Sequence, residues 1–578
     1  MAGRHHTLSS SIASLHGDEQ TVGSPLNPAE LQALKRTRLF GATGTVLMAI
    51  GALGAGARPV VQDPTFGVRL LNLPSRIQTV SLTMTTTGAV MMALAWLMLG
   101  RFALGKRRMS RGELDRTLML WVLPLLIAPP MYSKDVYSYL AQSQICRDGL
   151  DPYRVGPASG LGLGHVFTLS VPSLWRETPA PYGPLFLWIG RGISALTGEN
   201  IVAAVLCHRL VVLIGVVLIV WATPRLARRC GVAEVSALWL GAANPLLIMH
   251  LVAGIHNEAL MLGLMLTGAE FALRGLDAAR LKPTSWRPGP DWEPLGMLLG
   301  GSILIVLSSQ VKLPSLLALG FVTTALAYRN GGTVKALLLT GSAMAGLSVA
   351  VMALVGWASG LGFGWVFTLG TANVVRSWMS PPTLLALGTG QVGILLGLGD
   401  HTTAILALTR GIGVLIIMVV VSWLLLAVFR GRLHPIGGLG VALGLTVLLF
   451  PVVQPWYLLW AIIPLAAWAT RTGFRVAAIM VTLIVGILGP TANGDRFALF
   501  QIIDATLASI IIVVVIIAVT YTRLPWRALP EDDEANVPVG AHAASDTAPV
   551  EQDPTVASQV SPATPRSKAA PDAYADST

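Results

Sequence analysis

The chain has 578 residues, of which 53% are apolar and 12% are charged, and its mean hydropathy is +0.66. This balance excludes an ordinary soluble globular protein, because many separate apolar runs approach the roughly 20 helical residues that span hydrocarbon. The net charge of +11 does not indicate a nucleic-acid-binding protein, since the Lys and Arg residues lie mainly in the gaps between apolar runs.

The sequence therefore predicts an all-α polytopic membrane protein, with a cytoplasmic N-terminal tail at 1–37, a membrane domain at 38–527 and a disordered cytoplasmic tail at 528–578. The N-terminal tail is polar, and we expect it to be partly disordered. The first apolar run starts too far into the chain for a cleaved signal, so it is interpreted as a retained helix.

About fourteen membrane helices are predicted from apolar run lengths. Their approximate ranges are 39–58, 80–103, 117–131, 200–223, 232–252, from 258 onward, 295–311, 313–329, 334–357, 401–428, 435–453, the run after 453–460, the run before 493–496, and 499–521. The shorter apolar run 184–197 contains Arg191 and is interpreted as interfacial or re-entrant.

The orientation follows from the Lys- and Arg-rich gaps, which the positive-inside rule places in the cytoplasm. The clearest such gaps are 105–116, 225–230 and 274–290. Both termini then lie inside, residues 132–183 become the first large external loop, and residues 358–400 become a second external segment. Any active site is then expected at the external surface of the membrane.

The first external loop opens with PPMYSKDVYSYLAQSQICRDGLDPY, residues 129–153. We expect a short interfacial helix here, with Ser133 as its N-cap, Asp135 in its first turn and Gly149 ending it. Asp135 has two interpretations. It could simply stabilise the positive helix N-terminus, or the same electrostatics could keep a catalytic base ionised.

The predicted topology places further polar residues on the same external side. Each has a plain alternative: His256, Asn257 and Glu258 could cap the next helix, Lys312 could reach lipid headgroups, and residues 454–457 could be an aromatic belt. Joint placement favours a site. The candidate substrate-binding residues are Lys134, Tyr137, His256, Asn257, Glu258, Lys312, Arg376, Gln454, Trp456 and Tyr457, and the Asp495–Arg496 pair falls on this side too.

These residue types suit transfer of a sugar from a lipid-linked phosphate. Cations bind phosphate, aromatic and amide side chains bind a sugar, and one carboxylate can take the proton of an acceptor hydroxyl. A phosphate leaving group needs no general acid, whereas a glycosidase usually needs two opposed carboxylates. The chain has no GxxxxGK[ST] phosphate loop, which argues against a nucleotide-driven machine.

Several long segments carry a family resemblance. They are RHHTLSSSIASLHGDEQ (4–20), MYSKDVYSYLAQSQICRDGLDPYRVGP (131–157), TPAPYGPLF (178–186), AGIHNEALMLGLM (253–265), SSQVKLPSLL (308–317), VVQPWYLLW (452–460) and APDAYADST (570–578). In these segments the chain closely resembles the MptA/MptB family of α-(1→6)-mannosyltransferases, over nearly its whole length.

The resemblance implies a C-fold glycosyltransferase of the plasma membrane that uses polyprenyl-phosphate mannose, with its active site on the external (periplasmic) face. Its acceptor would be a phosphatidylinositol mannoside or lipomannan, and its product the mannan core of lipomannan and lipoarabinomannan. A β-linked donor giving an α-(1→6) product requires inversion. The resemblance also makes Asp135 the catalytic candidate. The family often has an acidic pair at this position, whereas this chain has Lys134–Asp135.

Two alternatives stay open at this point. The chain could be another polyprenyl-phosphate-sugar transferase, or a flippase or transporter for a lipid-linked sugar, although no internal repeat of the kind that transporters show is found. Cys146, Cys207 and Cys230 fall in different segments and indicate neither a disulfide framework nor a metal site. No cofactor is predicted, and participation of a divalent cation is left open.

Overall fold

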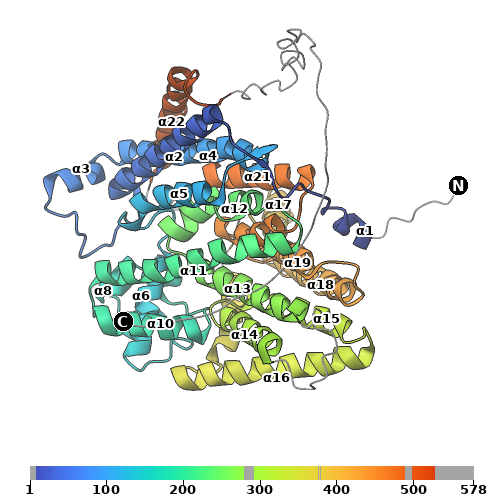
Figure 1. The fold of residues 1–578 in the computed structure, drawn as a ribbon. Coiled ribbons are helices and arrows are strands. Elements are labelled where there is room, and N and C mark those ends of the chain that lie inside the picture. The colour runs from blue at the N-terminus through green and yellow to red at the C-terminus, as the bar shows by residue number, and fades with distance from the viewer. Residues whose placement is uncertain (1–7, 279–291, 375, 378, 489–496, 527–578) are drawn as a thin grey trace, which may run out of the picture. The chain divides into compact units, whose positions relative to one another are not determined.

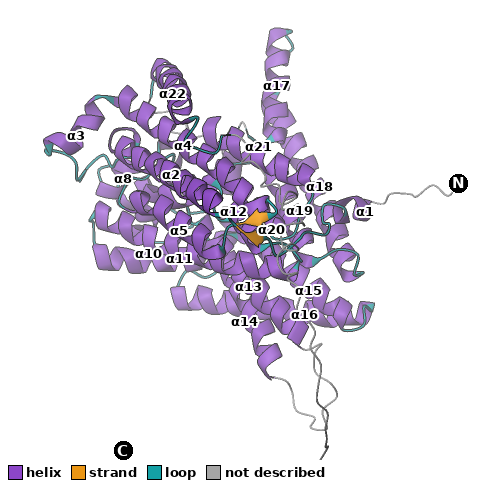
Figure 2. Cartoon of the chain, turned by 45° about the horizontal axis from the view of Figure 1, so that its top comes forward, coloured by secondary structure: helices purple, strands orange, loops and turns teal. Residues whose placement is uncertain are grey.

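The computed structural model describes residues 8–278, 292–374, 376–377, 379–488 and 497–526 (Figure 1). Nearly all of the regular structure in these ranges is helical (Figure 2). Two short strands, β1 (Ser24–Pro25) and β2 (Arg107–Arg108), pair in parallel. The prediction of an essentially all-α protein is confirmed. The expected tail at 528–578 and the Asp495–Arg496 pair lie outside the described residues.

Within the described ranges, eight helices are long and apolar enough to cross a membrane, which makes this a multi-pass membrane protein. They are α2 (Pro28–Ala55), α4 (Gln78–Leu104), α11 (Ile201–Arg229), α13 (Glu258–Ala278), α14 (Trp292–Ser309), α16 (Val334–Ser359), α18 (Thr402–Phe429) and α22 (Leu499–Thr520). The predicted total of about fourteen crossings also needs the shorter apolar helices, and it stays a prediction.

The shorter elements connect and flank these helices. The helices are α1 (Leu8–Ala13), α3 (Arg69–Arg76), α5 (Arg111–Val122), α6 (Asp135–Arg147), α7 (Pro157–Leu161), α8 (Val166–Ser170), α9 (Ser173–Arg176), α10 (Pro184–Thr197), α12 (Glu234–Gly241), α15 (Leu317–Arg329), α17 (Pro381–Leu395), α19 (Pro435–Leu449), α20 (Leu459–Ala466) and α21 (Thr472–Leu488). The 3₁₀ helices are η1 (Leu123–Leu126), η3 (Leu313–Leu316), η4 (Gly364–Val374) and η5 (Pro455–Leu458), and η2 (Leu247–Ala253) is a π-helix.

The membrane helices pack closely where glycines face each other. A side chain on Gly88 of α4 would lie 2.4 Å from the carbonyl oxygen of Gly44 in α2, and one on Gly263 of α13 would lie 2.5 Å from that of Gly215 in α11. Helices in a membrane gain no hydrophobic energy from leaving lipid, so close backbone approach at small residues provides much of their attraction.

Helix α2 begins before the predicted start near residue 39, because polar residues form its first turns. The side chain of Asn27 accepts a hydrogen bond from the Glu30 backbone N–H at 2.8 Å, and the Glu30 carboxylate accepts one from the Asn27 N–H at 2.8 Å. This reciprocal capping satisfies two N–H groups that would otherwise lack partners. The apolar run alone does not reveal such a start.

The N-terminal tail, which the sequence predicts to be partly disordered, makes specific contacts around residues 16–25. His16 lies 2.7 Å from the Trp468 carbonyl oxygen, and Gly17 donates to the Thr470 hydroxyl at 2.8 Å. Glu19 pairs with Arg108 at 3.4 Å and with Arg475 at 2.8 Å. These contacts, with the β1–β2 pairing, fasten the segment to two of the basic loops.

The predicted fifth membrane helix, 232–252, is divided in the structure. Helix α12 ends at Gly241, and the wider turn η2 continues from Leu247. Between them the Asn244 side chain accepts from the Leu246 N–H at 2.9 Å and donates to the Leu240 carbonyl at 3.0 Å. Pro245 cannot supply an N–H, so the side-chain amide takes over part of the backbone hydrogen bonding at this break.

The predicted second external segment, 358–400, includes helical structure. It contains η4 and the helix α17. The Ser380 hydroxyl accepts from the Thr383 N–H at 3.4 Å, and Pro381 occupies the first helical position. Two consecutive prolines look like a break in a helix, but proline is well tolerated at a helix start because its missing N–H has no helical partner there.

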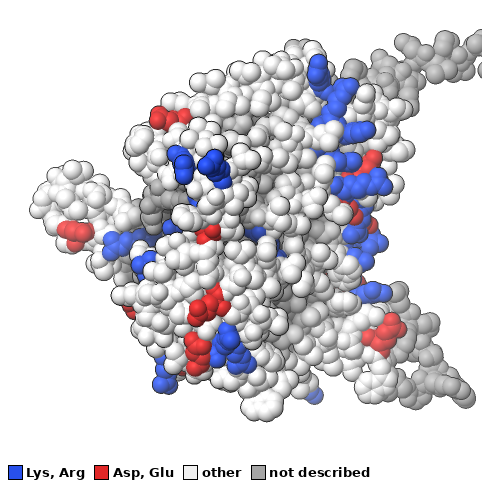
Figure 3. Space-filling view, turned by 90° about the vertical axis from the view of Figure 1, so that its left-hand side faces the viewer, with Lys and Arg blue, Asp and Glu red and all other residues white. Residues whose placement is uncertain are grey.

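The basic gaps meet at one end of the helices. Glu234 pairs with Arg228 at 2.9 Å and approaches Arg111 to 3.8 Å, which joins two gaps far apart in sequence. On the face shown in Figure 3, many Lys and Arg side chains follow one edge, others lie elsewhere on the face, and large areas carry no charge. This arrangement agrees with a topology in which the basic gaps all lie on the same side of the membrane.

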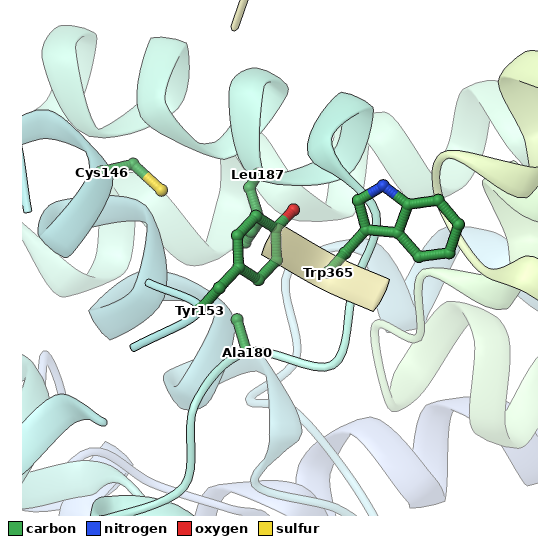
Figure 4. Close-up of a cluster of buried hydrophobic side chains, with 5 residues drawn as sticks. All are labelled: Cys146, Tyr153, Ala180, Leu187 and Trp365. Carbon is green, nitrogen blue, oxygen red and sulfur yellow. The ribbon is translucent and has the colours of Figure 1, made fainter. Parts of the chain in front are cut away.

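The two predicted external segments are held together by a cluster of buried apolar side chains (Figure 4). It contains Cys146, Tyr153, Ala180, Leu187 and Trp365, with the Tyr153 ring lying beside Leu187 and Ala180. Trp365 comes from η4 and the others from the first loop and α10. The Tyr153 hydroxyl also donates to the Tyr182 carbonyl at 3.1 Å. This packing fixes the wall of the site described next.

Candidate active site

A cavity of about 780 Å³ is lined by side chains from segments that lie far apart in the sequence. Seven of the eleven residues singled out from the sequence lie on its wall. They are Lys134, Asp135, Glu258, Lys312, Gln454, Trp456 and Tyr457. The cavity is therefore where the predicted external polar residues meet.

Asp135 is the first residue of α6. Its backbone N–H donates to the Ser133 hydroxyl at 3.1 Å, while Lys134 rather than Ser133 takes the N-cap position. The helix ends at Arg147, and Gly149 follows with a φ of +76°, as the sequence predicted. Asp135 thus sits at a helix N-terminus whose free N–H groups favour a carboxylate.

Burial raises the pKa of Asp135 to about 6, and the negative charge of Glu258 adds to the shift. The positive charge of Lys312 and the hydrogen bond with Ser133 partly offset it. The side chain keeps 23% of its surface accessible. A carboxyl group with this pKa is mostly ionised at neutral pH, yet it holds a proton more strongly than an ordinary aspartate, which suits a general base.

Two residues with left-handed backbone lie next to the site. Tyr132 has a φ of +64° just before Ser133, and Ile255 has a φ of +59° just before His256. The Met131 N–H donates to the Ala253 carbonyl at 2.9 Å, so the two strained segments are joined. Such conformations are costly for residues other than glycine and often mark functional sites.

Lys312 lies on the cavity wall, as Lys134 does. Its ammonium pairs with the Glu258 carboxylate and donates to the Tyr457 hydroxyl at 3.0 Å. It also lies 4.3 Å from the centre of the Tyr457 ring. Burial by itself lowers the pKa of Lys312, but Glu258 and Tyr457 raise it more, so the pKa is above its ordinary value. Lys312 therefore stays charged.

The APYGP turn brings the end of the first loop against the Lys312 segment. A side chain on Gly183 would lie 2.2 Å from the Gln310 carbonyl oxygen, so only glycine fits there. The Gly183 N–H donates to the Val311 carbonyl at 3.3 Å. Close backbone contact explains the turn, which places Tyr182 on the cavity wall.

His256 lies behind the cavity wall rather than on it. It is fully buried, and its ring stacks on Trp456 with 3.5 Å between centroids. Its Nδ1 is 3.7 Å from the Asp135 carboxylate. Burial lowers the pKa of His256 well below its usual value, and Lys312 adds to this. His256 is therefore a neutral neighbour of Asp135.

Three other candidate substrate-binding residues do not line the cavity. Tyr137 is 1% exposed, and its hydroxyl donates to the Ala57 carbonyl at 2.5 Å. Asn257 is 2% exposed, and its side-chain amide has no hydrogen-bond partner among the described residues. Arg376 is exposed but does not line the cavity. The first two face the protein interior, which a linear pattern in a short loop cannot reveal.

Sequence reasoning missed part of the wall. Trp175, Tyr182 and Trp460 line the cavity, and Leu313, Pro314, Val414, Phe450 and Val452 add an apolar surface. Tyr182 and Trp460 occur within segments already noted, APYGP and VQPWYLLW. Trp175 lies on α9, within a loop that gives no such signal.

In the described part of the chain, no three His, Cys, Asp or Glu side chains come together as a site for a metal ion. The three cysteines are free thiols.

The comparison with known families identifies both halves of the chain. Residues 38–328 match the family described as alpha-(1->6)-mannopyranosyltransferase, N-terminal domain, and residues 382–518 match the MptB C-terminal domain. The chain belongs to the MptA/MptB family of α-(1→6)-mannopyranosyltransferases. It is thus a mannosyltransferase, which is a class of glycosyltransferase.

Individual members of this family are similar over most of their length. An alpha-(1->6)-mannopyranosyltransferase of Mycobacterium tuberculosis is 78% identical, with 100% of both chains covered. Alpha-(1->6)-mannopyranosyltransferase B of Corynebacterium glutamicum is 40% identical over 81% of this chain and 78% of its own. Alpha-(1->6)-mannopyranosyltransferase A of M. tuberculosis is 32% identical over 83% of this chain and 88% of its own. No solved structure matches this chain.

The cavity draws on both family segments. Asp135, Glu258 and Lys312 fall in the N-terminal match, and Trp456 and Tyr457 fall in the C-terminal match. The two matched parts of this MptA/MptB-family chain therefore share one site.

Proposed function

We propose that this chain transfers mannose from polyprenyl-phosphate mannose to a phosphatidylinositol-mannoside or lipomannan acceptor, with inversion, at the external face of the plasma membrane. The product would be the α-(1→6)-mannan core of lipomannan and lipoarabinomannan. The observation that carries the proposal is one cavity holding a carboxylate with a raised pKa, a paired lysine and an apolar wall.

The wall chemistry supports a donor with a lipid tail. Lys312 has three N–H donors, of which Glu258 takes one and the Tyr457 hydroxyl another. The third is left for a phosphate oxygen. The apolar residues Leu313, Phe450 and Val452 suit a polyprenyl chain, and the Trp456 and Tyr457 rings suit the face of a sugar.

In the proposed reaction, the acceptor's primary hydroxyl attacks the anomeric carbon from the face opposite the phosphate. The new glycosidic bond forms as the bond between carbon and phosphate oxygen breaks, and the electron pair leaves on the phosphate. The hydroxyl proton passes to Asp135. His256, stacked on Trp456 and 3.7 Å from the carboxylate, acts as a positioning residue for Asp135.

The test uses purified protein in liposomes, with labelled polyprenyl-phosphate mannose and a defined phosphatidylinositol mannoside. We expect an extended acceptor whose new linkage is α-(1→6). A transporter of the lipid-linked sugar would move the donor between leaflets without extending the acceptor. Transfer of a different sugar in preference to mannose would favour the related polyprenyl-phosphate-sugar transferases instead.

A pH profile tests the role of Asp135. Because this base must be ionised, kcat should fall as pH drops through about 6, where Asp135 takes up a proton. The Ser133 hydrogen bond lowers this pKa, so Ser133→Ala should move the acid limb to higher pH. Ser138→Ala is the matched control, since its hydroxyl is buried on α6 without a partner among the described residues. An unmoved acid limb in Ser133→Ala would argue for another titrating group.

The external position of the cavity can be tested by thiol labelling. Cys146 and Cys230 are only 5% and 7% exposed, so new cysteines are needed in a Cys207→Ala background. The Arg154 side chain is 85% exposed and that of Arg228 is 59% exposed. An impermeant maleimide added to intact spheroplasts should label Arg154→Cys, and should label Arg228→Cys only after permeabilisation. The reverse pattern would overturn the charge-based orientation.

A further inference from the structure

Helix α3 presents its apolar side outward. Leu70 is 83% exposed and Leu73 is 50% exposed, and Phe66, just before the helix, is 82% exposed. The polar residues Asn72 and Ser75 lie on the opposite side and are partly buried. Helices on the surface of a water-soluble protein normally turn the apolar side inward. The outward apolar side of α3 therefore indicates that this side does not face water.

The loop that carries α3 is held in place by hydrogen bonds on its polar side. The Ser75 hydroxyl donates to the Asn72 side chain at 2.7 Å. Arg58 pairs with Asp63 and donates to the Thr65 hydroxyl at 3.0 Å. Gly54 at the end of α2 packs on Pro74, because a side chain there would lie 2.2 Å from the Pro74 carbonyl. These contacts fix the orientation of α3 with its apolar side outward.

The position of α3 in the chain indicates that lipid covers its apolar side. It lies in the connection between α2 and α4, just before α4 begins, and both of these helices are long enough to cross a membrane. Helix α3 therefore lies where they leave the hydrocarbon. Its apolar side continues into Ile77 and Val80, which are 43% and 51% exposed at the start of α4. Arg69 and Arg76 flank the leucines and are exposed. A short amphipathic helix with arginines at its rim is suited to an anionic lipid surface.

The same loop borders the active-site cavity. The Ala57 N–H donates to the Pro130 carbonyl at 2.7 Å, and Val60 donates to the Ser170 hydroxyl at 3.0 Å. A second cavity, of about 680 Å³, is lined by Arg58, Val60, Phe66 and Lys134, among others. Lys134 also lines the first cavity, next to Asp135.

We infer that α3 and Phe66 insert into the membrane surface on the Asp135 side, with Arg69 and Arg76 at phospholipid phosphates. We further infer that this contact brings a lipid-anchored acceptor past the Phe66 cavity to Lys134. The second part rests on the proposed function. Helix α3 and Phe66 would then form a lipid-docking element beside the cavity of the proposed transfer reaction.

Insertion is tested without any assay of activity. Nitroxide labels are placed at Leu70→Cys, Leu73→Cys and Asn72→Cys in the Cys207→Ala background, in vesicles of phosphatidylcholine with or without phosphatidylinositol. The labels at positions 70 and 73 should be accessible to oxygen and protected from a water-soluble nickel complex, and phosphatidylinositol should strengthen this protection. Equal nickel access at all three positions would place α3 in water and overturn the inference.

Delivery of the acceptor is tested with two double variants. L70Q/L73Q removes the apolar side, whereas L70F/L73F keeps it and serves as the matched control. In L70Q/L73Q, KM for a lipid-anchored acceptor should rise at least about tenfold, since burying one leucine in hydrocarbon corresponds to a factor of this order. KM for a water-soluble mannoside should stay unchanged. Equal losses with both acceptors would contradict delivery. Absence of transfer by the unaltered enzyme would instead contradict the proposed function, and the spin-label result would still stand.

Discussion

Replacing Asp135 with Asn is expected to lower kcat by at least about 100-fold while leaving donor binding close to normal. Asn keeps the size of the side chain and most of its hydrogen bonding, but it cannot accept the proton of the acceptor hydroxyl. General-base assistance alone is typically worth 10²–10⁴-fold in rate. The loss should therefore appear in kcat rather than in the donor KM, measured by steady-state kinetics with labelled donor.

Asp148→Asn provides the matched control for this variant. Asp148 is an exposed carboxylate just after the last residue of α6, and its side chain accepts a hydrogen bond from Gln144 at 2.8 Å. Its replacement changes charge on the same helix outside the cavity and should leave kcat unchanged. Near-normal turnover in Asp135→Asn would reduce Asp135 to a residue that stabilises the start of α6, and Glu258 would become the next base to test.

The shared location of these residues could be predicted because the number of membrane crossings before a residue decides on which side of the membrane it lies. Each crossing reverses the chain, so basic gaps and polar motifs alternate between the two surfaces. That reasoning predicted that Asp135, Glu258, Lys312 and Tyr457 would share a surface, and all four line one cavity. It rests on apolar run lengths and on charge, which are the strongest signals in a chain of this composition.

Side-chain direction within a motif was beyond such reasoning. His256 and Glu258 are two residues apart, yet His256 is buried against Trp456 while Glu258 reaches the cavity. The left-handed backbone of Ile255 redirects the chain at this point. A sequence does not predict this conformation at an isoleucine, because β-branched residues rarely adopt it. Tyr137 likewise faces inward because its hydroxyl meets the Ala57 carbonyl, a contact between segments far apart in sequence.

Lys312→Ala is expected to raise the donor KM more than about tenfold. Lys312 lies on the cavity wall, where a charged hydrogen bond to phosphate would contribute about 1.5–3 kcal/mol. Removing the ammonium also leaves the Glu258 carboxylate, which is only 1% exposed, without its partner. That second effect repels the donor phosphate as well. Lys312→Arg should keep the charge and recover part of the affinity, although a planar guanidinium fits this site differently.

Arg376→Ala is the matched control, because the sequence makes both cations candidate substrate-binding residues. Arg376 is exposed and lies off the cavity wall, so its loss should leave the donor KM within about twofold, as for most exposed charges whose contacts are worth under about 1 kcal/mol. A large rise in KM for Arg376→Ala with none for Lys312→Ala would move the donor phosphate away from Lys312. Lys312 would then only neutralise Glu258, and the phosphate would have to be held from the side of the cavity nearer η4.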